Sequence, residues 1–189
     1  AGYGGTGALN YSVAIGYGAL DATGDSGDAA GAVAIGYQAL TANYDGQYNT
    51  AIGYNALGAN KRNDFNTAVG YNAVNAITTG YGNTAVGTET LDAVTEGFYN
   101  IGIGPAAGGS ITTGDYNIAI GYAAFDAATT AGSTIAIGYA ALGAYTHGEN
   151  SFNVAIGTQV AYLKTSGRFN TYIGGYKVAD ADLTGEKNV

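Results

Sequence analysis

The chain lacks several residue types on which other folds depend. Its 189 residues include no cysteine, no tryptophan and no methionine, and only one proline and one histidine. Without cysteine it can form neither a disulfide scaffold nor a thiolate metal site. A single proline excludes a proline-rich disordered chain. No stretch approaches the roughly 18 consecutive apolar residues of a transmembrane helix, so we expect no membrane insertion.

Charge is also scarce and is mostly of one sign. Charged residues make up 11% of the chain, with 14 acidic against 6 basic side chains and a net charge of −8. Nucleic acids and anionic membranes attract clustered lysine and arginine. We therefore expect no nucleic-acid partner.

Glycine is abundant, with 33 residues, and ten of these glycines are evenly spaced. Seven of the nine separations between them are 17 residues, and the other two are 20 and 19. The ten landmark glycines are Gly16, Gly36, Gly53, Gly70, Gly87, Gly104, Gly121, Gly138, Gly157 and Gly174. A short fixed period along the chain indicates one structural unit stacked on copies of itself.

The residues before each landmark glycine predict a strand. Counting from that glycine, position −1 is always valine or isoleucine, position −2 is mostly alanine, and position −3 is valine, isoleucine or threonine. β-Branched residues favour strands, and alternate residues point to opposite faces. We expect the β-branched residues, with a large apolar residue at +4, to form the core. The alanine and glycine face would then be left for other chains.

Other positions of the unit also recur. Asparagine is frequent at −4 and is expected to pair amide to amide along the stack. Tyrosine is frequent at +1, where it is expected to form a stacked structural ladder. A glycine at +10, such as Gly46, Gly80, Gly97, Gly114, Gly148 and Gly167, is expected to adopt a left-handed turn.

These patterns predict an all-β protein, a parallel β-roll or β-solenoid of about ten coils, with two short strands and two turns in each coil. Residues 1–178 form a single repeat array with an irregular first coil, and residues 179–189 form a polar tail or cap. Nine steps of about 4.8 Å give a rod of roughly 43 Å.

The units Asn-Thr-Ala-Ile-Gly-Tyr-Asn-Ala-Leu at 49–57 and Asn-Thr-Ala-Val-Gly-Tyr-Asn-Ala-Val at 66–74 resemble repeats of bacteriophage tail fibres and large bacterial surface proteins. They are also similar to the shorter head repeat of trimeric autotransporter adhesins, whose nearest match here is residues 11–16. The resemblance implies a left-handed roll, a homotrimer and a role in a fibre that touches surfaces.

Small side chains let backbones approach closely, so the alanine and glycine face is the predicted contact between chains. A trimer is expected, although a dimer would satisfy the same reasoning. The candidate interface residues are Ala51, Gly53, Ala68, Gly70, Ala85, Gly87, Ala119, Gly121, Ala136 and Gly138.

Catalytic and metal-binding patterns are weak. His147 lies in a polar loop and is expected to be solvated. Asp21, Asp25 and Asp28 are a weak calcium candidate: their oxygens could surround a calcium ion, but their spacing matches neither an EF-hand nor the nonapeptide calcium repeat. Glu89, Asp92 and Glu96 are close in sequence, but nothing singles them out as a glycosidase pair. We expect no enzyme, no cofactor and no metal.

Tyrosines outside the regular ladder are candidates for glycan contact, because an exposed phenol stacks on sugar rings. These are Tyr44, Tyr81, Tyr145 and Tyr162. The expected function is a non-enzymatic structural or adhesive segment of an extracellular trimeric fibre, on a phage tail or a cell surface, which attaches to a glycan or protein. The alternatives are a self-assembling extracellular filament and an ice-binding solenoid.

Overall fold

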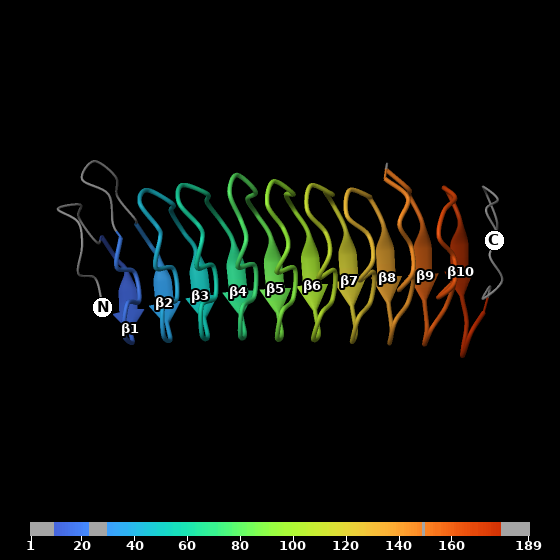
Figure 1. Ribbon diagram of the computed structural model, residues 1–189, viewed down its shortest axis with the longest axis horizontal. Helices are drawn as coiled ribbons and strands as arrows, with labels where there is room; N and C mark the ends of the chain where they lie inside the picture. Colours follow the sequence, from blue (N-terminus) through green and yellow to red (C-terminus); the bar gives the residue numbers. More distant parts are fainter. Residues whose placement is uncertain (1–9, 23–29, 149, 179–189) are drawn as a thin grey trace.

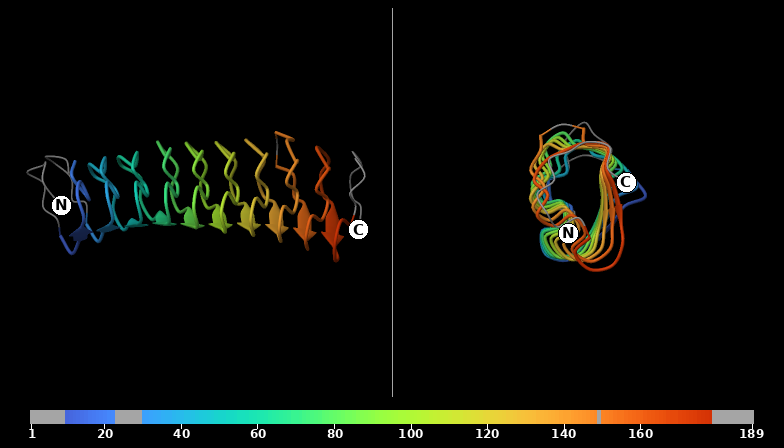
Figure 2. Two further views of the ribbon diagram at one scale, coloured as in Figure 1. Left: turned by 60° about the horizontal axis from the view of Figure 1, so that its bottom comes forward. Right: turned by 90° about the vertical axis from the view of Figure 1, so that its right-hand side faces the viewer.

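The computed structural model describes residues 10–22, 30–148 and 150–178. Along these residues the chain winds into a parallel β-solenoid of about nine turns, with about 17 residues per turn and no helix. Successive coils lie side by side along a rod (Figure 1), and viewed end-on they superpose into one oval outline (Figure 2). The predicted all-β parallel solenoid is therefore confirmed.

Each coil contributes one strand of three residues, and the ten strands form one parallel sheet in sequence order. Equivalent positions pair with each other: Ala51 lies beside Ala68, and Ala68 beside Ala85. The strands are β1 (Val13–Ile15), β2 (Val33–Ile35), β3 (Thr50–Ile52), β4 (Thr67–Val69), β5 (Thr84–Val86), β6 (Ile101–Ile103), β7 (Ile118–Ile120), β8 (Ile135–Ile137), β9 (Val154–Ile156) and β10 (Thr171–Ile173).

The prediction of two strands per coil is wrong, because left-handed residues turn the rest of each coil. In the coil after β3, Asn55, Leu57 and Phe65 have φ angles of 55°, 51° and 60°. Such angles are costly for residues other than glycine, so neighbouring coils must hold them in place. The backbone N–H of Asn55 donates to the carbonyl of Tyr37 at 2.9 Å, and that of Leu57 donates to the carbonyl of Ala73 at 3.1 Å.

The prediction of a β-branched core is also wrong, because the alanines point inward. Ala51, Ala68 and Ala85 are fully buried, whereas the valine or isoleucine beside each of them is half-buried or exposed. The space behind the strand is narrow. A Cβ on Gly102, which takes the place of alanine in β6, would lie 2.9 Å from the side chain of Leu91. The core therefore consists mainly of these alanines, of the alanines and large apolar residues at +3 and +4, and of apolar residues at +7 such as Ile77 and Val94.

The glycines at +10 are needed for close approach rather than for a left-handed turn. Among those described, only Gly167 has a positive φ angle, of 106°. A Cβ on Gly97 would lie 2.5 Å from the carbonyl oxygen of Gly114 in the next coil. No side chain fits at this contact between coils, which explains the glycine without the predicted left-handed conformation.

The predicted asparagine ladder is confirmed. The side-chain oxygen of Asn66 accepts hydrogen bonds from the backbone N–H and the side-chain amide of Asn83, at 3.0 and 3.2 Å. The amide of Asn83 also donates to the carbonyl of Gly97 at 2.8 Å. The ladder thus satisfies buried backbone groups and joins successive coils.

Candidate functional site

One side of the solenoid carries only uncharged β-branched side chains. We call the side chains at positions −3 and −1 of β1–β10 the strand face; every one is valine, isoleucine or threonine. In the middle of the sheet, Val86 and Ile103 are 40% and 41% exposed. A continuous apolar column on the outside of a protein marks an interaction surface.

Stacked aromatic rings flank the strand face at the corners before and after the strands. At position +1, the rings of Tyr17, Tyr37, Tyr54 and Tyr71 follow one another with centroids 5.4, 5.1 and 5.3 Å apart. At position −5, Tyr48 stacks on Phe65 at 5.4 Å. The prediction that the regular tyrosines form structural ladders is confirmed.

The predicted interface residues do not form a contact surface. Their alanines (Ala51, Ala68, Ala85, Ala119 and Ala136) are fully buried inside the solenoid. Their glycines (Gly53, Gly70, Gly87, Gly121 and Gly138) stand at the corner after each strand with φ angles between 125° and 144°. There, each glycine packs against the glycine of the next coil. The alternation of small and β-branched residues was read correctly, but the two faces were assigned in reverse.

Two hollows that share Arg62, Asn63 and Thr79 lie on the turns that precede β4 and β5. One, of about 360 Å³, is lined by Tyr44, Lys61, Arg62, Asn63, Thr78 and Thr79. The other, of about 340 Å³, is lined by Arg62, Asn63, Asp64, Phe65, Thr79 and Tyr81. We call them together the turn hollows. They bring two of the predicted glycan-contact residues, Tyr44 and Tyr81, to one site.

Polar residues interrupt the repeat at the turn hollows. Position +7 is Asn43 and Asn60 in these coils but Ile77, Val94 and Ile111 in the following ones, and all five are buried. The amide of Asn60 donates to the side-chain oxygen of Asn43 at 2.8 Å. This cluster is not among the predicted site residues, because the apolar residue that recurs at +7 was not identified as a core position.

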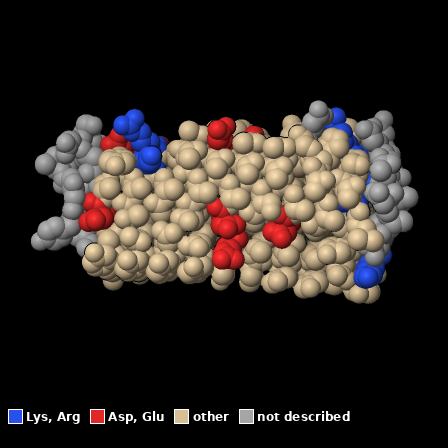
Figure 3. Space-filling model, in the orientation of Figure 1, with Lys and Arg blue, Asp and Glu red and all other residues tan. Residues whose placement is uncertain are grey.

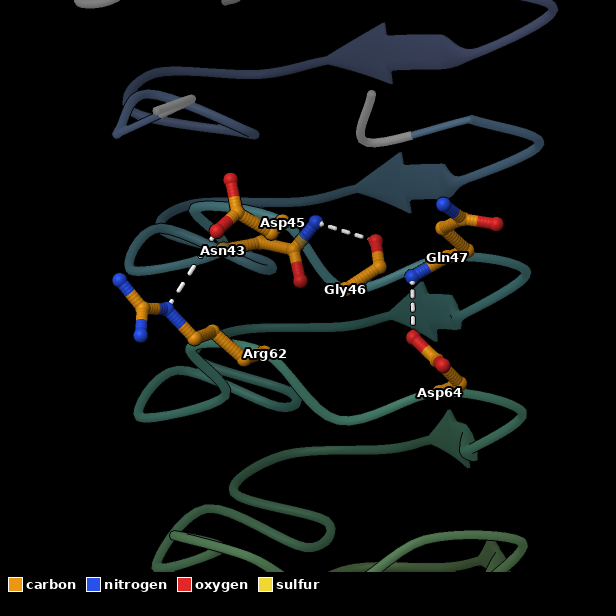
Figure 4. A network of polar contacts seen from close by, with 6 residues as sticks. All are labelled: Asn43, Asp45, Gly46, Gln47, Arg62 and Asp64. Atoms are coloured by element: carbon orange, nitrogen blue, oxygen red, sulfur yellow. Dashed lines mark hydrogen bonds and ion pairs between the residues drawn. The ribbon is translucent and has the colours of Figure 1, made fainter. Parts of the chain in front are cut away.

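Ion pairing and backbone capping fix the residues around the hollows. Nε of Arg62 lies 3.3 Å from a carboxylate oxygen of Asp45, and the backbone N–H of Gln47 donates to Asp64 at 2.7 Å (Figure 4). The guanidinium of Arg62 extends away from the strands. Its terminal nitrogens have no partner among the described residues and face solvent.

The other two predicted glycan contacts differ from each other. Tyr145 is fully buried and its hydroxyl donates to the carbonyl of Gly167 at 2.7 Å, so it cannot contact a glycan. Burial also raises the pKa of its phenol. The prediction that Tyr145 lies in an outer turn is wrong, because its ring occupies the interior position +7. Tyr162 lines a separate hollow of about 160 Å³ beside Tyr122, Tyr139 and Asp126.

The acidic candidates form no metal cluster within the described ranges. Of the calcium candidates, Asp21 is described, and Asp25 and Asp28 lie outside the described residues. A Cβ on Gly109 would lie 2.9 Å from a carboxylate oxygen of Asp126 and 3.4 Å from one of Asp92. Partial burial raises the pKa of both carboxyls, and the charge of Glu89 adds to this effect at Asp92.

Comparison with known proteins finds no matching family model, no matching curated protein and no matching solved structure. Within the part of the chain that the structure describes, no helix has the length and apolar character needed to cross a membrane. The strand face and the turn hollows are therefore the features from which function is inferred.

Proposed function

We propose that this chain is a rigid, non-enzymatic segment of an extracellular trimeric fibre, of the kind found in phage tails or cell-surface adhesins, which attaches to a surface. The observation that carries the proposal is the strand face. Ten consecutive coils present it without a single charged side chain, although the core lies on the other side of the same strands. A second and a third copy of the chain are its proposed occupants.

The strand face extends along the whole described sheet. Nine steps of about 4.8 Å make it about 43 Å long, so copies packed along it would meet over ten strands. None of the acidic residues belongs to the strand face, and in the view of Figure 3 several of them gather near the middle of the rod.

Three copies around one axis would bury the strand faces and direct the turn hollows outward. The units at 49–57 and 66–74 resemble those of fibres that are trimeric and left-handed, and both features belong to this proposal. Three identical outer surfaces would multiply a weak affinity at each single site. The mechanism is mechanical reach combined with multivalent attachment.

Charged substitutions on the strand face test the proposal. Val86→Lys and Ile120→Lys, two strands apart, would place unpaired ammonium groups in the interface, which is strongly unfavourable. We expect the double variant to have about one third of the mass of the unmodified protein in light scattering. Thr113→Lys, an exposed change in an outer turn, is the control and should leave the mass unchanged. Equal masses for all three proteins would refute the role of the strand face.

The first alternative, a self-assembling filament, depends on the two ends of the sheet. Within the described residues, β1 pairs only with β2 and β10 only with β9, so a filament would grow by pairing of further strands at β1 and β10. The polar tail 179–189, which was expected to decide between capping and docking, lies outside the described residues. Long filaments in electron micrographs would favour the filament.

The strand face is also regular and exposed, as an ice-binding surface would be. Only four of the ten residues at position −3 are threonine: Thr50, Thr67, Thr84 and Thr171. The face therefore offers few hydroxyls to order water. Thermal hysteresis of a purified monomer would favour ice binding over the fibre.

A further inference from the structure

We propose that the turn hollows bind a carboxylated sugar, so that the surface to which the fibre attaches is an acidic glycan. This inference rests on the proposed role in attachment and adds the chemical class of the ligand. Four observations carry it: the placement of charge, the exposed fork of one arginine, the flanking aromatic rings, and the polar residues that break the repeat beneath the hollows.

Two of the six basic residues lie at this site, and the other four lie between positions 164 and 187. Lys61 and Arg62 are the only lysine and arginine in the first 163 residues of a chain with a net charge of −8. Both side chains are exposed on the same turn, where Figure 3 shows a blue patch near the N-terminal end. Asp45 pairs with Arg62 and Asp64 also lines one hollow. Lys61 and the free end of the Arg62 guanidinium are therefore the groups that would attract an anionic ligand here.

The geometry of Arg62 suits a carboxylate. Its side chain is 78% exposed, and Asp45 holds its Nε at 3.3 Å. The two terminal nitrogens are left to donate in parallel, which is the bidentate arrangement preferred by carboxylate groups. Asp45 thus orients the guanidinium of Arg62 and leaves its two terminal nitrogens accessible.

The aromatic rings and hydroxyls around the hollows suit a sugar rather than a small inorganic anion. Tyr44 and Tyr81, at opposite ends of the pair of hollows, are 43% and 40% exposed. Exposed phenol rings offer an apolar face for a sugar ring and a hydroxyl for its polar rim. The exposed Thr78 and Thr79 add hydroxyls between them.

The broken repeat beneath the hollows is the independent observation. Asn63 lines both hollows and is 92% buried (8% exposed), and its amide nitrogen has no hydrogen-bond partner; the side-chain oxygen of buried Asn60 also has none. A buried polar group without a hydrogen-bond partner is destabilising. The following coils show that isoleucine or valine and glycine fit these positions. Polar residues at positions that are apolar or glycine in the other coils are expected where they serve a binding site rather than stability.

Calorimetric titration of the full chain tests the proposal. The acidic probes are tetragalacturonate, an alginate tetramer and sialyllactose; the neutral probes are methyl-esterified tetragalacturonate and lactose. We expect at least one acidic probe to bind and its neutral counterpart to bind at least tenfold more weakly. Arg62→Ala and Tyr81→Ala should each weaken binding at least tenfold. Lys177→Gln and Tyr176→Ala, a cation and an exposed tyrosine away from the hollows, should change it less than twofold.

Binding of none of the acidic probes, or equal binding of acidic and neutral probes, would overturn the proposal, as would acidic binding that Arg62→Ala leaves intact. Arg62 and Tyr81 are exposed, so unchanged melting temperatures will show that the variants are folded. The mass of the protein in solution distinguishes a failure of the acidic-sugar proposal from a failure of the fibre proposal. A monomer that binds acidic sugars refutes the fibre alone, and a trimer that binds none refutes the acidic-sugar site alone.

Discussion

The side-chain oxygen of Asn83 accepts two hydrogen bonds from Asn100, 17 residues later: one from its backbone N–H at 3.0 Å and one from its side-chain amide at 3.1 Å. Asn100 in turn donates to the carbonyl of Gly114 at 2.8 Å and accepts from the backbone N–H of Asn117 at 3.0 Å. Both asparagines are fully buried. The asparagine ladder therefore joins successive coils by hydrogen bonds, as backbone hydrogen bonds join the strands of a sheet.

Replacing one member of the ladder is expected to be costly. Asn100→Ala leaves the N–H of Asn117 and the carbonyl of Gly114 buried without these partners, and we expect a loss of about 3 kcal/mol in the free energy of unfolding. Urea denaturation followed by circular dichroism measures it. Asn75→Ala, at a half-buried asparagine outside the ladder, should lose less than about 0.5 kcal/mol. Equal losses would show that the ladder adds no stability.

A methyl group on a landmark glycine is expected to disrupt the stack. Gly121 has a φ angle of 125°, and a Cβ there would lie 2.5 Å from the carbonyl oxygen of Gly138. Gly121→Ala therefore combines backbone strain with a collision against backbone, and it should lower the melting temperature by 10 °C or more. Gly175 has open space around it, and Gly175→Ala should shift the melting temperature by less than about 2 °C. A tolerated Gly121→Ala would contradict the register of the coils.

Adding the same side chain on the two faces of β5 tests which face is the core. Ala85→Ile forces three extra carbons into a filled interior and should cost about 1–3 kcal/mol or more. Thr84→Ile adds an apolar group on the strand face, where neighbouring Ile101 already has one, and should be neutral or stabilising. Chemical denaturation of the two variants gives the comparison. The reverse order of stability would restore a β-branched core.

Much of the fold follows from the period alone. Seven separations of 17 residues between landmark glycines fix the stacking, the parallel pairing and the register, because each coil can match only its neighbour. The period does not predict which side of each strand faces the core. Alternating residues define two faces of a strand, but the alternation alone does not show which face is buried. The left-handed turns were missed because residues such as Leu57 and Phe65 carry no glycine signal and are held by hydrogen bonds between coils.

The site was only partly predictable. Tyr44 and Tyr81 were chosen as irregular tyrosines, and they prove to line adjoining hollows. Tyr145 met the same criterion but fills the interior position +7, which was not recognised as a core position. Because the apolar residue at +7 had not been identified, the polar Asn43 and Asn60 could not be recognised as departures from it.

The carboxyls of Asp92 and Asp126 are expected to make stability depend on pH. Burial raises both pKa values in the folded state, so the folded protein binds protons more tightly than the unfolded chain. Their contribution is fully present below the unfolded pKa of about 3.9 and is lost as pH rises through the raised folded values. The double variant Asp92→Asn, Asp126→Asn should therefore gain stability relative to the unmodified protein at pH 7 but not at pH 3.5.

Melting temperatures across this pH range give the difference directly. Glu96→Gln removes an exposed carboxylate and controls for the change in net charge. A gain for the double variant that is independent of pH, or that is matched by Glu96→Gln, would show that the two buried carboxyls are not its source.

The central claim is that the strand face joins copies of this chain, and the mass of the unmodified protein in solution tests it most directly. Size-exclusion chromatography with light scattering should give a single species of about 56 kDa, three times the chain mass of 18.8 kDa. A species of 18.8 kDa at micromolar concentration would contradict the claim, because a strand face that stays exposed to water would then have no partner of its own kind.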